Sequence, residues 1–86
     1  MSTTAAAEDR LRIELARAEM LLKRKLRAAR VRRRLTVEQV ARKIGVEAEQ
    51  VERFESGKSN PTLPAINRYA EAVGVTITYL VEDVKP

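Results

Sequence analysis

Residues 6–33 contain neither glycine nor proline and consist mostly of Ala, Leu, Arg, Lys and Glu, which favour helices. Apolar side chains recur there at intervals of three or four, at Leu11, Leu15, Ala18, Leu22, Leu26 and Ala29. This spacing predicts one long helix with a single apolar face. From Leu11 to Leu22 the intervals are typical of a coiled coil, but Lys25 takes the next position, and about two heptads are too few to establish one. The helix is expected either to dimerise or to fold back on its own domain.

Three shorter helices follow, each delimited by residues that favour helix ends. The first begins at Thr36, which has capping-box spacing with Gln39, and ends at Gly45. The others are expected over residues 47–56 and 62–74, before Gly57 and at Gly74. Their inward faces carry Val37, Val40, Ala41, Ile44, Val51, Phe54, Ile66, Ala70 and Val73. The sequence therefore predicts an all-α bundle of four to five helices.

The C-terminal segment has two interpretations. Residues 75–81 are rich in β-branched and aromatic side chains that alternate, which favours a short β-strand. A lone strand needs a partner, most simply its own copy across a two-fold axis. The alternative is a short fifth helix that buries Ile77 and Leu80. The strand is the preferred prediction.

Composition argues against catalysis and metal binding. The chain has no cysteine and no histidine, so it lacks thiolate ligands, the commonest metal ligand and the usual general base. It also has no glycine-rich phosphate loop. We expect no enzyme, no cofactor and no metal site. No apolar run is long enough for a membrane span, and residues 1–8 lack the layout of a signal peptide, so a cytoplasmic, nucleoid-associated location is expected.

Positive charge is concentrated in the first part of the chain. The net charge is +5, but residues 1–34 hold 11 basic and 4 acidic side chains, whereas residues 35–86 hold 6 and 8. A basic stripe on one element is typical of a polyanion-binding protein, although a solvated helix face explains such a run equally well.

Two short helices joined by a glycine-containing turn are typical of a helix-turn-helix, whose second helix enters the major groove. Residues 26–80 resemble the lambda-repressor-like (Cro-type, XRE) helix-turn-helix family. The resemblance rests on Leu26-Arg27-x-x-Arg30, Leu35-Thr36-x-x-x-Val40-Ala41, Ile44-Gly45-Val46, Val51-x-x-Phe54-Glu55-x-Gly57-Lys58-x-Asn60-Pro61 and Ala70-x-x-Val73-Gly74-Val75. It implies a sequence-specific regulator that reads double-stranded DNA with residues 47–56.

The resemblance also implies roles for individual residues. Arg30 and Glu55 match a structural ion pair between the first helix and the end of the recognition helix. Arg53 is the best candidate for reading a guanine, with a surface pair to Glu49 as the alternative. The other residues expected at DNA are Ala48, Glu49, Gln50 and Glu52 on the recognition helix, Ser56, Lys58, Ser59 and Asn60 in the loop after it, and Val37, Arg42 and Lys43 on the preceding helix.

Several residues depart from the family pattern. Val37 replaces a frequent glutamine that bonds the DNA backbone, and Arg34 replaces the glycine that usually ends the first helix. The recognition helix is acidic, and this weakens the expectation of tight base reading. Backbone affinity would then come from basic residues of the first helix, namely Lys23, Arg24, Lys25, Arg27, Arg32, Arg33 and Arg34.

These features predict three segments: an N-terminal tail and helical extension (1–21), the DNA-binding domain (22–74) and a C-terminal tail with a dimerisation strand (75–86). The preferred function is a dimeric transcriptional repressor. The alternative is the antitoxin of a HigBA-type pair, which binds a toxin RNase and represses its own operon. Binding of the basic helix to RNA or to a membrane surface is the least favoured option, because residues 11–26 contain no Trp or Phe anchor.

Overall fold

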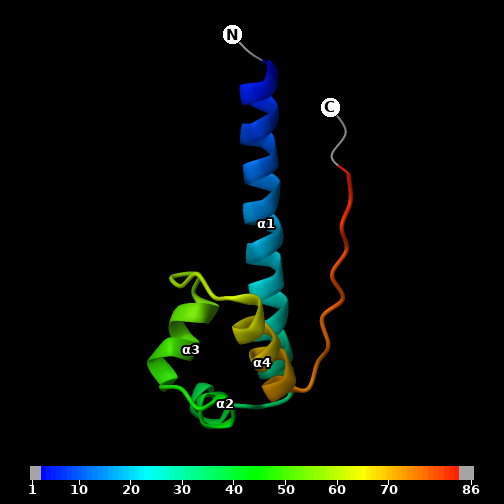
Figure 1. The fold of residues 1–86 in the computed structure, drawn as a ribbon. Helices are drawn as coiled ribbons and strands as arrows, with labels where there is room; N and C mark the ends of the chain where they lie inside the picture. Colours follow the sequence, from blue (N-terminus) through cyan, green and yellow to red (C-terminus); the bar gives the residue numbers. More distant parts are fainter. Residues whose placement is uncertain (1–2, 84–86) are drawn as a thin grey trace.

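The computed structural model describes the backbone of residues 3–83 and the side chains of residues 6–83. Its four helices are α1 (Thr3–Arg32), α2 (Val37–Ile44), α3 (Ala48–Glu55) and α4 (Leu63–Val73). The predicted all-α helix-turn-helix bundle is confirmed. Figure 1 shows α2, α3 and α4 gathered around the C-terminal part of α1, whose N-terminal part extends beyond them.

Helix ends follow the capping signals of the sequence. The Thr36 hydroxyl accepts from the Gln39 N–H, and the Gln39 side chain accepts from the Thr36 N–H, so the expected capping box is formed. Gly45 and Gly74 end α2 and α4 in the left-handed conformation, with φ of 86° and 80°. α1 ends differently, because Arg34 takes a φ of 56° although it has a Cβ atom. The short helices are thereby held at fixed lengths.

One core joins the four helices. Its buried residues are Leu26, Ala29, Val40, Ala41, Val51, Phe54, Ile66, Tyr69, Ala70 and Val73. α2 packs against α3 and α4, and α1 contacts α3 and α4. Since α1 contributes to this core only from Leu22 onward, its preceding two thirds carry no part of the domain.

The predictions for the C-terminal segment need correction. Residues 75–83 form neither a strand nor a helix. Val75 and Ile77 pack against the core, and the Tyr79 hydroxyl donates to Asn67 Oδ1 at 3.0 Å. A strand needs the backbone of a second strand beside it, and the described part of this chain contains no other extended segment that pairs with it.

Candidate nucleic-acid interface

α3, the expected recognition helix, is fixed at its end by a buried carboxylate. Glu55 lies at the last turn of α3, and its side chain is 7% exposed. Arg30 of α1 donates from Nε to Glu55 Oε2 at 2.7 Å and from Nη2 to Oε1 at 2.9 Å. The Arg30 Nη1 group also donates to the Leu35 carbonyl at 2.9 Å. One guanidinium therefore ties α3 to α1 and to the turn that precedes α2.

A third helix joins this network through Tyr69 of α4. The Tyr69 hydroxyl donates to Glu55 Oε2 at 2.5 Å, and its ring lies 4.9 Å from that of Phe54, centroid to centroid. Burial, together with the hydrogen bond to Glu55, raises the pKa of Tyr69 well above its ordinary value. The hydrogen bond to Glu55 raises the pKa of Arg30 in spite of partial burial. Tyr69 therefore stays a neutral donor while Glu55 is held by a permanent cation.

The loop after α3 is held by a buried lysine of α1. Lys23 is only 8% exposed, and its Nζ donates to the Ser59 carbonyl at 3.2 Å while lying 5.9 Å from the centroid of the Phe54 ring. Lys23 was expected among the phosphate-binding residues, and that expectation is wrong because the ammonium group is turned into the domain. The signal was in the sequence, since Lys23 stands three residues before Leu26 and seven before Arg30, on the core face of the helix.

Hydrogen bonds within the loop shape its start. The Lys58 N–H donates to the Arg53 carbonyl at 2.9 Å, and the Ser56 hydroxyl donates to the same carbonyl at 3.2 Å. Lys58 and Asn60 are exposed, whereas the Ser59 hydroxyl is buried and has no hydrogen-bond partner among the described residues. The structure therefore leaves Lys58 and Asn60 free to meet a ligand, and it turns Ser59 inward.

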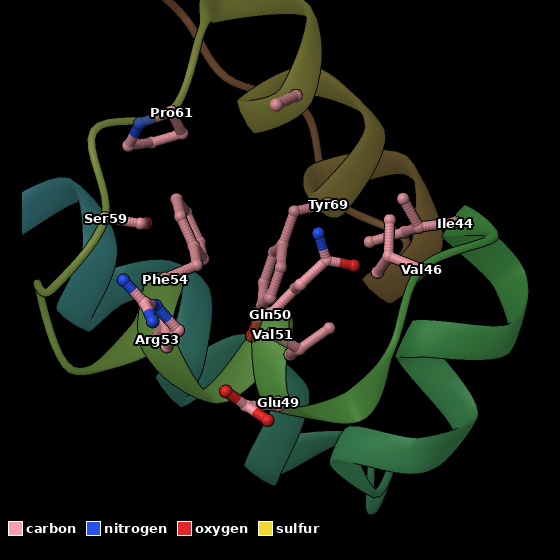
Figure 2. A pocket seen from close by; sticks show the side chains of 11 residues that line it. Ile44, Val46, Glu49, Gln50, Val51, Arg53, Phe54, Ser59, Pro61 and Tyr69 are labelled. Atoms are coloured by element: carbon pink, nitrogen blue, oxygen red, sulfur yellow. The ribbon is translucent and has the colours of Figure 1, made fainter.

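The outward face of α3 carries Glu49, Glu52 and Arg53, all exposed. Arg53 forms no ion pair within the described part of the chain, so the alternative pairing with Glu49 is not formed. Figure 2 shows Arg53 and Glu49 as separate groups on α3. This face of α3 thus carries two carboxylates and one guanidinium that forms no ion pair among the described residues.

Two other residues expected at DNA have partners within the protein. The Gln50 side chain accepts from the Glu47 N–H at 3.0 Å and so caps the start of α3. Ala48 is partly buried and packs against the core. Glu47 is followed three residues later by Gln50, which is capping-box spacing, so the sequence contained this signal.

The three residues of α2 that are expected at DNA also differ in whether they have partners within the protein. Val37 packs against the core, and the Lys43 ammonium donates to the Ala72 carbonyl at 3.3 Å near the end of α4. Arg42 is exposed, beside a shallow hollow that it lines with Leu35, Gln39 and Lys43. Of the three, Arg42 is the residue with a charged group free of a partner among the described residues.

A hollow of about 500 Å³ lies beside α3, between that helix, the loop and α4. Figure 2 shows its wall, in which Phe54 and Pro61 stand on one side, Ile44 and Val46 on the other, and Tyr69 between them. Glu49, Gln50 and Arg53 form its polar part. The hollow is mostly apolar, and no cluster of metal-binding side chains occurs in the described part of the chain.

Basic residues of α1 lie near the C-terminal end of α3, where Glu55 is located. Arg24, Arg27 and Arg32 line one surface together with Glu55. Arg27 Nε lies 3.7 Å from Glu55 Oε1, but its side chain is 63% exposed. Of the basic residues expected on α1, all but Lys23 are therefore exposed, and Arg24, Arg27 and Arg32 lie close to the end of α3.

Among the described residues, none of the helices has the length and apolarity needed to cross a membrane. No curated protein and no solved structure matches the chain. The model of a family described as a helix-turn-helix domain matches residues 21–80, which is more than half of the chain. Domains of this kind bind DNA through the second helix of the helix-turn-helix motif. This match points to a regulator rather than an enzyme. The protein therefore belongs to a helix-turn-helix domain family and carries a DNA-binding domain, in agreement with its lambda-repressor-like sequence pattern.

Proposed function

We propose that the protein is a sequence-specific transcriptional repressor that binds double-stranded DNA as a dimer, with α3 in the major groove. The observation that carries this proposal is the attachment of α3 to both α1 and α4 through the single carboxylate of Glu55. A helix held in this way presents Arg53 to a base edge without having to order itself first, and such preorganisation favours selective binding.

Base reading is assigned to the exposed part of α3. Arg53 has the donor geometry to bond guanine O6 and N7 together, and it is not engaged by an ion pair among the described residues. Glu49 and Glu52 accept hydrogen bonds only, so they suit the N4 amino group of cytosine. Both carboxylates repel phosphates, and they favour DNA in which a cytosine lies within reach.

Phosphate contacts are assigned to groups around α3. Lys58, Asn60 and Arg42 are exposed, and Arg24, Arg27 and Arg32 add positive charge beside the end of the helix. Such groups fix the register of the protein on the duplex and contribute affinity that falls steeply with salt. They offset the repulsion caused by the acidic face of α3.

The test is fluorescence anisotropy on the DNA upstream of the protein's own coding sequence and on a scrambled duplex, across a salt series. We expect the upstream DNA to bind more tightly by roughly 10³-fold at physiological salt. Arg53→Ala should remove about 1–3 kcal/mol of this preference. Lys58→Ala should weaken both duplexes alike and reduce the salt slope by about one. Arg68→Ala, an exposed residue of α4, is the control for loss of one charge.

Equal, weak and salt-sensitive binding of both duplexes would contradict base reading by α3. It would favour a second candidate function, the antitoxin of a HigBA-type pair. The observation behind this candidate is the exposed N-terminal part of α1, where Ile13 and Met20 are 52% and 54% exposed. An apolar strip of this kind suits the surface of a partner protein. Co-purification with the product of an adjacent RNase-like gene, and inhibition of that RNase, would test it.

A further inference from the structure

The N-terminal part of α1 has no packing partner among the described residues. Every described side chain from residue 6 to residue 21 is exposed, including Leu15 at 61% and Leu11 at 38%. Figure 1 shows this part projecting away from α2, α3 and α4. Helices of this length are marginal in water when they have no packing contacts, so an apolar face of this kind favours association.

The exposed face has a regular order that ends in opposite charges. Six positions of this face are spaced alternately by three and four residues, and we refer to them together as the seam. They are Glu8, Leu11, Leu15, Ala18, Leu22 and Lys25. Leu22 is partly buried against the core, and the other five are exposed. The seam thus has four apolar positions, an acid at one end and a base at the other.

This order distinguishes the two ways in which two identical helices can pair. We propose that two copies of the chain pair through their α1 seams in antiparallel orientation, an arrangement that builds the dimer on which the proposed function rests. The seam then places Glu8 opposite Lys25 of the second copy at both ends, and Leu11 opposite Leu22. A parallel pair would instead place Glu8 against Glu8 and Lys25 against Lys25.

The residues that flank the seam have the same preference. Arg12 and Glu19 stand on the same flank of the seam, and antiparallel pairing brings each beside the other residue of the second copy. In a parallel pair, Glu14 on the opposite flank would instead face Glu19 of the second copy, and two carboxylates would repel. Charge complementarity therefore selects the second copy as the occupant and the antiparallel direction as its orientation.

The antiparallel pair also gives a suitable distance between the two DNA-reading helices. α1 holds the loop after α3 at Lys23 and the end of α3 at Arg30, and these two anchors lie on average about ten residues from the midpoint of the seam between Leu15 and Ala18. At 1.5 Å per residue, the two anchor regions lie roughly 30 Å apart along the helices. Half-sites one turn of DNA apart are separated by about 34 Å. The separation of the two anchor regions along the helices is thus similar to the spacing of successive major grooves on one side of the duplex.

Disulfide trapping in the full-length chain tests the arrangement, because the chain has no cysteine of its own. An equimolar mixture of Leu15→Cys and Ala18→Cys is oxidised and analysed by mass spectrometry. The expected main product is the mixed disulfide, since these two positions lie opposite each other in the antiparallel pair. Leu11→Cys alone should not link to itself, because its two copies are roughly 16 Å apart along the helices. A self-linked Leu11→Cys product would overturn the antiparallel direction.

Charge reversal gives an independent measurement by sedimentation equilibrium without DNA. Glu8→Lys should weaken the dimer roughly tenfold, because like charges then meet at both ends of the seam, and Lys25→Glu added to it should restore the dimer. Loss of dimerisation in a chain truncated to residues 1–74, with Leu15→Glu without effect, would show instead that the C-terminal tail forms the dimer. Because no DNA is present, the α1 pairing can fail while base reading by Arg53 stands, and the reverse also holds.

Discussion

Arg30 of α1 and Glu55 of α3 stand 25 positions apart in the sequence and are joined by two hydrogen bonds of 2.7 and 2.9 Å. Both side chains are largely buried, at 13% and 7% exposure. This pair fixes the position of the C-terminal end of α3 relative to α1. Since a buried ion pair contributes more to geometry than to net stability, its main effect is the orientation of α3.

Removal of one partner of this pair should be severe. Arg30→Ala leaves the buried Glu55 carboxylate with Tyr69 as its remaining close donor, and we expect the free energy of unfolding to fall by about 3–5 kcal/mol. Urea denaturation followed by circular dichroism measures the change. Arg27→Ala is the matched control, since its exposed guanidinium lies 3.7 Å from the same carboxylate and should contribute less than about 1 kcal/mol. Similar losses in the two variants would show that the network is not the anchor described above.

The buried phenol predicts alkaline sensitivity. Because the pKa of Tyr69 is raised above its ordinary value of 10.0, folding favours the neutral form. Its stabilising contribution is complete below pH 10 and is lost as the pH rises above 10, because the unfolded chain then releases the proton first. Tyr79→Phe leaves Tyr69 as the only tyrosine, and an ultraviolet titration of tyrosinate should show a midpoint well above pH 10. A midpoint near 10 in the folded protein would contradict the buried hydrogen bond to Glu55.

Lys23 should influence DNA binding without contacting DNA. Lys23→Met keeps the apolar stem but removes the donor to the Ser59 carbonyl, so the loop of residues 56–60 should exchange its amide protons faster. Affinity should fall on specific and scrambled DNA alike, with an unchanged salt slope, because a buried ammonium neutralises no phosphate.

Arg24→Met is the control for this experiment, because it removes the same charge from an exposed site one residue away. It should leave amide exchange in the loop unchanged. If Lys23→Met lowered the salt slope as a surface phosphate contact would, the positioning role of Lys23 would be disproved.

The turn after α1 stores backbone strain. Arg34 has a φ of 56°, a region that disfavours residues with a Cβ atom. Arg34→Gly should therefore stabilise the domain by about 0.5–1 kcal/mol, measured by thermal unfolding as a rise of a few degrees in Tm. Arg32→Gly, inside the last turn of α1, should have the opposite sign because glycine weakens helices. A fall in Tm for Arg34→Gly would mean that the arginine side chain contributes more than the strain costs.

The fold was largely predictable from the sequence, for local reasons. Thr36, Gly45, Thr62 and Gly74 act within one helical turn, so their capping roles need no knowledge of the rest of the chain. The helix boundaries derived from them are confirmed. The strand expected over residues 75–81 does not form within the single chain, because its alternation reports which side chains are suited to burial, whereas a strand depends on a neighbour that no local pattern supplies.

The candidate site was less predictable, because charged and polar residues were interpreted by their type alone. Lys23 was assigned to phosphate, and Gln50 to DNA, whereas one holds a loop carbonyl and the other caps α3. The hydrogen bond from Tyr69 to Glu55 was not anticipated, since it joins residues of two helices that meet only in the folded domain. The roles of Arg53, Lys58 and Asn60 at DNA stay predictions.

α1 is continuous from Thr3 to Arg32, with no glycine or proline to interrupt it. The exposed part of the helix and the part that holds Glu55 therefore form one rigid rod, without a hinge between them. In the proposed antiparallel dimer, the length of this rod would set the distance between the two α3 helices, and no segment could stretch to accommodate a longer spacer. One added base pair shifts a half-site by about 3.4 Å and rotates it by roughly a tenth of a turn. The protein would accordingly tolerate almost no variation in the spacing of its operator half-sites.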